Sequence, residues 1–379
     1  MSDIIIIFHT ESNTGYAMSP LEKTFFQMAA AVTEDVNRIH FGFKSFKNGI
    51  PKSLPENFAN LITIDREDPT TLDAAGRYIQ EKNIIYAFCF DLQVSSNIGT
   101  MLRKNGVRKI ISYWGAAMSG ENSGLKLAAK RLEVFFRRGK PDHFIFESEA
   151  MRHFAINGRG LAKRSTSVIP TGVDINKYHP DNVQKSLLAE LFLIPENANV
   201  VFYSGHMEQR KGVHVIINAA IELVDRLKQK NIYFLIAGNK PGEETIFLDQ
   251  LNGHQAKSNV IFAGYRTDLN KIMPCCDIGV IASTGWDSFP MSSIEMAACG
   301  LPLVVSDLQG LSETVEDGKT GITFPPGQHL ALANAVLDLF GDQKKLKKFS
   351  IAARRRIEAG YSTKHQLTNL ILCCQKILN

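Results

Sequence analysis

The sequence has few of the features that mark membrane-spanning, exported or metal-binding proteins. Across its 379 residues, no apolar run approaches the roughly 20 residues that a membrane-spanning helix needs. The first residues lack a basic segment and a small-residue cleavage site, so Ile4–Ile7 are expected to begin a strand and not an export signal. The six cysteines form neither a CxxC metal frame nor a disulfide scaffold. These absences predict a cytoplasmic protein with reduced thiols, no cofactor and no essential metal.

The signatures of several well-known nucleotide-binding classes are also missing. The sequence has no GxGxxG turn, which a nicotinamide-dependent dehydrogenase requires, and no GxxxxGK[ST] phosphate loop. No RNA-binding or helix-turn-helix signature accompanies the basic residues, so we expect no nucleic-acid partner.

Positive charge is in modest excess and gathers in two stretches. The 43 Lys and Arg residues outnumber the 38 Asp and Glu residues, which gives a net charge of +5. Residues 126–140 and 344–356 are both basic and have a helical pattern. The first stretch also has an apolar face, made of Leu125, Leu127, Leu132, Val134 and Phe135. Each stretch is either a solvated helix face or a surface for a polyanion such as anionic lipid. For Lys126–Lys140, the second interpretation means peripheral contact with the inner face of a membrane.

Short apolar runs alternate with longer amphipathic segments along most of the chain. Before Pro180 the predicted strands are Ile4–Phe8, Ile39–Phe43, Leu61–Ile64, Ile84–Phe90, Lys109–Tyr113, His143–Glu147 and Ser167–Ile169. After Pro180 they are Val200–Tyr203, Tyr233–Ala237, Val260–Phe262, Ile278–Ala282, Leu303–Ser306 and Ile322–Phe324. Continuous apolar strands separated by helices are typical of parallel sheets that are covered on both faces.

The chain length and the two successive series of strands predict two doubly wound, Rossmann-like α/β domains. We expect an N-terminal domain over residues 1–172 and a C-terminal domain over 173–360. A helix over 361–379 is expected to pack back toward the first domain. Ligands of open α/β sheets bind at the carboxyl ends of the strands, so the loops there are the place to look for a site.

The loop after Ile278–Ala282 leads into a predicted helix. Pro290 stands where a helix begins, because its missing N–H is not needed in the first turn. Free N–H groups and partial positive charge at a helix N-terminus suit a phosphate. Asp287 precedes this terminus and Glu295 lies more than a turn inside. The two carboxylates are expected either to bind hydroxyl groups beside a diphosphate or to serve the helix as a cap and an ion-pair partner.

A second loop follows Val200–Tyr203. Gly205 and Gly212 bracket a turn that carries two adjacent cations, Arg210 and Lys211. This arrangement suits the neutralisation of a leaving diphosphate, and the alternative is a solvent-exposed basic turn.

Taken in order, these segments resemble a known family. The spacing of Asp287 and Glu295 resembles the E-x7-E signature of retaining glycosyltransferases of family 4, which have the GT-B fold, with Asp287 in place of the first glutamate. The hinge-like segment 169–174, the loop from Gly205 to Gly212 and the strand end 235–238 are also similar to family segments. The resemblance spans residues 148–326. It implies a GT-B fold, in which two Rossmann-like domains face each other across a cleft, with residues 1–172 as the acceptor-side domain and 173–360 as the nucleotide-sugar-binding domain.

The resemblance implies a role for each matching position. Glu295 would hold the donor ribose, Asp287 would contact the transferred sugar, and Lys211 would bind the diphosphate together with Arg210. The other donor-binding positions that it implies are Gly205, His206, Gly264, Tyr265, Arg266, Ser288, Phe289, Pro290 and Met291. His206 stands where the family has arginine, and Asp287 is one methylene shorter than glutamate. These departures leave the identity of the donor open.

The first domain resembles the family only in its alternation of strands and helices. Gly15 lies where the family has a glycine-rich loop near the donor phosphate. Trp114 follows a strand, and we expect it either to stack on a sugar or to pack between the domains. Asp91 ends another strand and is a candidate carboxylate on the acceptor side.

The resemblance therefore implies a retaining hexosyltransferase that uses a UDP- or GDP-sugar and acts by front-face substitution. Its acceptor would be a saccharide or a lipid-linked molecule in polysaccharide, lipopolysaccharide or glycolipid assembly. Such a reaction asks the protein mainly for alignment and charge stabilisation. Two alternatives stay open: a sugar-nucleotide epimerase of the same fold, and a non-catalytic nucleotide or carbohydrate binder.

Overall fold

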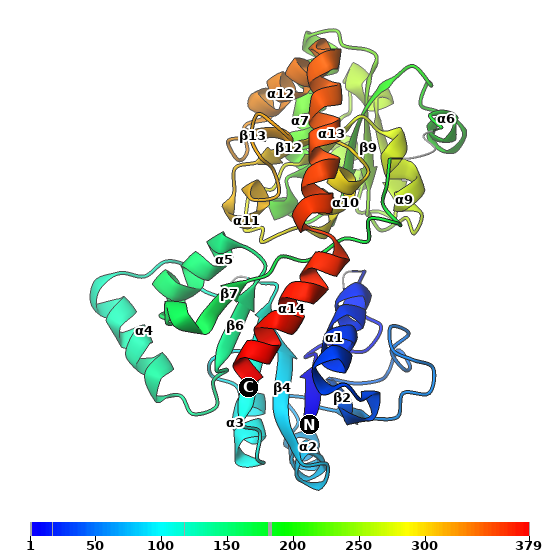
Figure 1. Cartoon of the computed structure of the whole chain (residues 1–379). Coiled ribbons are helices and arrows are strands. Elements are labelled where there is room, and N and C mark those ends of the chain that lie inside the picture. Colours follow the sequence, from blue (N-terminus) through cyan, green and yellow to red (C-terminus); the bar gives the residue numbers. More distant parts are fainter. Residues whose placement is uncertain (1, 17, 117, 181–183, 379) are drawn as a thin grey trace. The chain divides into compact units, whose positions relative to one another are not determined.

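The computed structural model describes residues 2–16, 18–116, 118–180 and 184–378 (Figure 1). The chain divides into two compact units: unit 1 comprises Met1–Pro170 and Thr363–Asn379, and unit 2 comprises Thr171–Ser362. These divisions lie within two residues of the boundaries that the sequence suggests. The last helix, α14 (Thr363–Leu378), belongs to unit 1.

Unit 1 is built on a seven-stranded parallel sheet in the order β3-β2-β1-β4-β5-β6-β7. Its strands are β1 (Asp3–Ile7), β2 (Ile39–Phe43), β3 (Leu61–Thr63), β4 (Ile84–Phe90), β5 (Lys109–Trp114), β6 (His143–Phe146) and β7 (Thr166–Val168). Besides α14, its helices are α1 (Met18–Thr33), α2 (Pro69–Glu81), α3 (Asn97–Lys104), α4 (Gly124–Phe136) and α5 (Glu149–Phe154). Each strand lies within one residue of its predicted bounds.

Both faces of this sheet are buried, which explains why its strands are apolar without interruption. Ile4 and Ile6 of β1 pack into one core with α1 and α14, where Phe8, Phe25 and Leu370 also lie. Ile5 and Ile7, which point to the other face, pack into a second core with α2 and α3. The alternation within a single isoleucine run therefore serves two helical layers, as a doubly wound fold requires.

Unit 2 has a six-stranded parallel sheet in the order β10-β9-β8-β11-β12-β13. Its strands are β8 (Asn199–Ser204), β9 (Ile232–Ala237), β10 (Val260–Gly264), β11 (Ile278–Ile281), β12 (Leu303–Ser306) and β13 (Gly321–Phe324). Its helices are α6 (Ser186–Phe192), α7 (Val213–Ile221), α8 (Thr245–Gln250), α9 (Leu269–Ile272), α10 (Met291–Ala298), α11 (Gln309–Ser312), α12 (His329–Gly341) and α13 (Gln343–Gly360). The strand order reverses between β8 and β11, as it does between β1 and β4 in unit 1, and such switch points are where α/β sheets bind ligands.

Helix α4 turns most of its apolar residues to solvent. Of the apolar residues predicted to form one face, only Val134 is buried in α4. Leu125 is 91% exposed, Leu132 60% and Phe135 74%, and Phe136 beside them is 73% exposed. An amphipathic pattern locates an apolar stripe but does not say which side of the helix meets the protein. Among the described residues, no helix has the length and apolar character needed to cross a bilayer.

Candidate functional site

The loop after β8 is held against the end of β11 by very close backbone packing. A short 3-10 turn, Gln209–Lys211, ends at Gly212, which has a φ of 71°. A Cβ atom on Gly212 would lie 1.7 Å from the carbonyl oxygen of Ala282, so only glycine fits there. The amides of Thr284 and Gly285 donate to the carbonyl of Arg210 at 2.8 and 3.2 Å. The two loops that the sequence singles out therefore lie side by side at the switch point of unit 2.

Lys211 and Asp287 form an ion pair across these loops. The Lys211 Nζ lies 3.1 and 3.0 Å from the two carboxylate oxygens of Asp287. Ser283 Oγ donates a third hydrogen bond to this carboxylate at 2.7 Å. Asp287 is only 5% exposed, and a buried charge needs such partners. The sequence motifs predict Lys211 and Asp287 as site residues, but they predict neither their pairing nor the part of Ser283.

Arg210 and His206 lie on the solvent side of the same loop. Arg210 Nε is 2.7 Å from a carboxylate oxygen of Glu208, and its Nη1 donates to the carbonyl of Trp286 at 2.9 Å. The His206 side chain is exposed, whereas its carbonyl accepts from the Tyr203 hydroxyl at 2.9 Å. Arg210 is therefore the guanidinium that approaches the β11 loop, at a place where His206 supplies no fixed charge.

Helix α10 begins where the sequence predicts, directly after Pro290, whose φ is −62°. Pro290, the cap residue, offers no side-chain hydrogen bond to the first turn, where the Ser293 hydroxyl donates back to the Pro290 carbonyl at 2.6 Å. Glu295, in the second turn, is 2% exposed, and Phe289 stacks on Tyr361 with ring centroids 5.6 Å apart. Ser288 and Met291 stand on either side of Phe289 and Pro290 in the chain.

The turn after β10 joins this edge through two more glycines. The Gly238 amide donates to the Gly264 carbonyl at 2.9 Å, and a Cβ on Gly238 would lie 2.2 Å from the Gly205 carbonyl oxygen. Asn239, which the sequence motifs do not include, accepts from the Gly264 amide at 2.9 Å. Tyr265 is 66% exposed, and Arg266 pairs with Asp268. The predicted donor-binding loops of unit 2 thus meet along one edge of the sheet.

A cavity of about 510 Å³ lies at the corresponding edge of unit 1. It brings together the two acceptor-side candidates, Asp91 and Trp114, with His9, and it is lined further by Arg66, Glu67, Gln93, Ser95, Ser96 and Asn97. The serines and Asn97 are not among the predicted site residues, although a polar run directly after a buried strand is a usable indication. Gly15 is not among the lining residues. Its loop is tied to residues 48–50, whose carbonyls accept from the Asn13 amide at 2.9–3.3 Å.

Asp91 has an unusual backbone and electrostatic environment in this cavity. Its φ is 53°, in the left-handed region that non-glycine residues seldom adopt. Burial raises the pKa of its carboxyl group to about 7, although the group accepts a hydrogen bond from the Gly115 amide at 2.8 Å. Burial also lowers the pKa of His9, so this imidazole favours its neutral form.

Trp114 contributes a polar atom without a counterpart. The side chain is 5% exposed, and its indole N–H has no hydrogen-bond partner within the described part of the chain. Buried donors are nearly always paired. The cavity therefore combines an unsatisfied donor, a carboxyl group that titrates near neutrality and several uncharged polar side chains.

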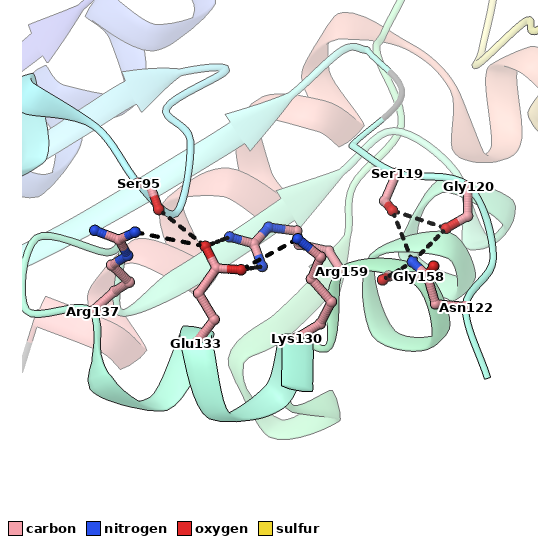
Figure 2. A network of polar contacts seen from close by, with 9 residues as sticks. All are labelled: Ser95, Ser119, Gly120, Asn122, Lys130, Glu133, Arg137, Gly158 and Arg159. Carbon is pink, nitrogen blue, oxygen red and sulfur yellow. Dashed lines mark hydrogen bonds and ion pairs between the residues drawn. The ribbon is translucent and has the colours of Figure 1, made fainter. Parts of the chain in front are cut away.

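Helix α4, which carries the predicted membrane contact, turns its single acid inward. Glu133 is within 3.3 Å of Lys130, 2.9 Å of Arg159 and 3.9 Å of Arg137, and Ser95 donates to it at 3.4 Å (Figure 2). The exposed stripe of Leu125, Leu132, Phe135 and Phe136 lies between basic residues that include Lys126 and Arg131. In the described ranges, no group of His, Cys, Asp and Glu is arranged to hold a metal ion.

Comparison with solved structures identifies the fold as GT-B. The Anabaena protein HepE, solved in complex with UDP and glucose, superposes with a TM-score of 0.77 at 19% identity, over 98% of this chain and 99% of that one. Residues 187–356, which contain the unit 2 site, match the family model described as glycosyl transferases group 1.

Two curated relatives have sequences similar to this chain. A D-inositol 3-phosphate glycosyltransferase from Nocardia farcinica is 28% identical over 56% of this chain and 48% of its own length. A GDP-mannose-dependent alpha-(1-6)-phosphatidylinositol monomannoside mannosyltransferase from Mycolicibacterium smegmatis is 26% identical over 77% and 76%. The chain thus spans about half the length of the Nocardia relative.

Proposed function

We propose that the protein is a retaining glycosyltransferase that moves a hexose from a UDP- or GDP-sugar to an acceptor hydroxyl. The observation that carries this proposal is the buried Lys211–Asp287 pair at the switch point of unit 2. It lies inside the region that matches the glycosyltransferase family model. The names of both relatives describe glycosyl transfer, and one uses GDP-mannose.

The ion pair suggests how a donor engages the site. A diphosphate is a stronger partner for an ammonium group than one carboxylate, because it presents several charged oxygens. Donor binding would draw Lys211 toward the diphosphate, with Arg210 beside it, and would release Asp287 to accept from a sugar hydroxyl. Glu295 would hold the ribose, the backbone of residues 288–291 the sugar and phosphate, and the turn 264–266 the base.

The acceptor is assigned to the cavity of unit 1. Its lining is rich in polar side chains, which suits a saccharide. The unpaired Trp114 N–H and the Asp91 carboxyl group offer a donor and an acceptor to hydroxyl groups. Front-face substitution needs no enzymic base, because the leaving phosphate takes the proton of the acceptor. In this scheme Asp91 aligns the acceptor.

A peripheral membrane contact through α4 accompanies this function. Exposed apolar stripes flanked by lysine and arginine bind the interface of anionic bilayers. A second copy of the chain is a poor occupant, because a symmetric contact would bring the basic flanks of α4 together. Contact of α4 with a membrane would give the protein access to a lipid-linked acceptor at the cytoplasmic face.

The first test is thermal-shift binding with UDP, GDP, ADP and their sugars, with and without magnesium, followed by product analysis with saccharide acceptors. We expect selective stabilisation by one nucleoside diphosphate and transfer with retention of the anomeric configuration. Conversion of the sugar nucleotide without an acceptor would identify an epimerase instead. Binding without turnover would identify a non-catalytic binder.

Flotation with vesicles tests the membrane contact separately. Wild-type protein is expected to float with vesicles of phosphatidylglycerol and phosphatidylcholine, and Leu132→Ser/Phe136→Ser is expected to stay in solution. The matched control Ile246→Ser/Leu330→Ser removes two exposed apolar residues from unit 2 and should float normally. Equal flotation of both variants would exclude α4 as the contact.

A further inference from the structure

A groove of about 970 Å³ runs beside α13 in unit 2, the long orange-red helix of Figure 1. One wall is a single face of α13, and the other includes the turn that leads into β13, with Glu316, Lys319 and Thr320. Its cations are Lys319, Lys344, Lys347, Lys348, Arg355 and Arg356, and its one carboxylate is Glu316. None of its lining residues belongs to the loops at the carboxyl edge of the sheet.

The arrangement of these cations opposes the stability of the helix. Lys344 has Lys347 and Lys348 three and four positions later, and like charges at those spacings repel. Lys344 also lies in the first turn of the helix, where the helix dipole disfavours positive charge. An ordinary solvated helix face carries mixed charges at these spacings. These lysines therefore create a positive field that an anion would relieve.

Two basic residues next to these lysines but outside the groove lining are paired, whereas four of the six cations inside it are not paired within the described chain. Lys345 is bonded to Asp338, and Arg354 lies 2.7 Å from Glu358. Among the described residues, Lys344, Lys347, Lys348 and Arg355 have no ion-pair partner. Protein acids thus neutralise Lys345 and Arg354, which lie outside the groove lining, and leave these four cations of the groove available.

The other side of the groove does not offset this charge. Glu316 is bonded to Lys319, and this hydrogen bond lowers the pKa of its carboxyl group. Arg356 is fixed at one end, where its Nη2 donates to the Glu313 carbonyl at 2.9 Å and to the Tyr361 hydroxyl at 3.0 Å. Its Nε is buried and has no hydrogen-bond partner in the described chain.

The shape and lining distinguish between classes of anion. From Lys344 to Ala359 the helix face extends about 22 Å, which is long enough for several charged units of a chain. Between the lysines and the arginines of α13, the lining has only Ile351 and Ala352. The groove therefore has no apolar stripe like that of α4 with which to enter a bilayer. Tyr361 is covered by Arg356, 5.0 Å from its ring centroid, and offers no stacking platform for bases.

We propose that this groove binds a linear anionic polysaccharide, with carboxylate or phosphate groups along its chain. The chain would lie along α13 with its charges between the lysines at one end and Arg355 at the other. This is a binding site separate from the proposed donor and acceptor sites. Its test needs no nucleotide, so the result does not depend on whether the transferase assignment is correct.

The experiment measures binding of a fluorescently labelled polyuronate to the full chain by anisotropy. In Lys344→Gln/Lys347→Gln/Lys348→Gln we expect affinity at low salt to fall at least about tenfold and to depend less on salt concentration. The control Lys228→Gln/Lys230→Gln/Lys240→Gln removes the same charge from exposed positions of the same unit and should bind like wild type. Arg355→Gln, at the far end of the groove, should also weaken binding.

Folding and ligand class are checked in the same experiment. The groove triple variant should melt at or above the wild-type temperature, because it loses repulsive pairs. Wild-type affinity in this variant, or an equal loss in the control, would overturn the proposal. A single-stranded RNA of equal charge that binds more tightly than the polyuronate, and loses affinity in the same variant, would overturn the assigned class of ligand.

Discussion

The carboxyl edges of the two sheets occupy equivalent places in the fold but have opposite chemical character. In unit 2, charged groups are satisfied by one another: Lys211 is bonded to Asp287, and Arg210 to Glu208. In unit 1, the cavity holds an unpaired indole N–H and a carboxyl group whose pKa is raised to about 7. The edge of unit 2, here called the paired edge, suits a highly charged ligand that can replace one member of an ion pair. The edge of unit 1, here called the unsatisfied edge, suits the hydroxyl groups of a ligand. The same doubly wound scaffold therefore supports two kinds of recognition through its loops alone.

Removing the cation of the paired edge is expected to have the largest effect. Lys211→Ala should lower kcat/KM for sugar transfer, with a loss of about 2–4 kcal/mol of transition-state stabilisation. The reason is that the diphosphate loses one fixed positive partner. Steady-state kinetics with the donor found by thermal shift measures this. Lys257→Ala, which removes a lysine on the surface of the same unit, is the control. Undiminished turnover in folded Lys211→Ala protein would show that the pair has only a structural role.

Left-handed glycines provide the next comparison between the two edges. Gly212 and Gly15 have similar φ values, 71° and 76°, but different space around them. A Cβ on Gly212 would lie 1.7 Å from a backbone oxygen, whereas one on Gly15 would meet only Met18 Cγ at 3.8 Å. We expect Gly212→Ala to lose about 3 kcal/mol and Gly15→Ala about 1 kcal/mol of unfolding free energy. Urea titration of both variants measures the difference, and equal losses would mean that the β8 loop moves aside easily.

The two edges also differ in how far the sequence predicts them. Unit 2 has an ordered set of short motifs, so Lys211, Asp287 and Glu295 can be identified from the sequence alone as candidate site residues. The pairing of Lys211 with Asp287 is not predicted, because it depends on Gly212 bringing two backbones into contact. In unit 1, Asp91 and Trp114 are each identified as strand-end residues, but the cavity that joins them depends on side-chain packing. For α4, the sequence pattern predicts an apolar stripe, but periodicity alone does not say whether such a stripe faces the protein or solvent.

The smallest effect is expected at the unsatisfied edge, where protonation of Asp91 contributes to stability. Its folded-state pKa is about 7, and burial is the main cause of the increase from the usual value of 3.8. Between about pH 4 and 7 the folded chain therefore keeps a proton that the unfolded chain has lost. Wild-type stability should fall relative to Asp91→Asn as pH rises through this window. The change should be roughly 2 kcal/mol after allowance for partial solvation of the group.

Asp68, in the same unit, is a control whose contribution to stability should change with pH in the opposite direction. It caps α2, and its hydrogen bonds with Thr70 lower the pKa of its carboxyl group. Stability from Asp68 is therefore present above about pH 4 and is lost below it, so Asp68→Asn should differ from wild type mainly at acidic pH. Urea midpoints at pH 3.5, 5.5 and 7.5 separate the two patterns. If the stability of wild type and of Asp91→Asn changes with pH in the same way, water enters the cavity freely, because a well-solvated carboxyl group keeps its ordinary pKa. The contrast between a paired and an unsatisfied edge would then rest on Trp114 alone.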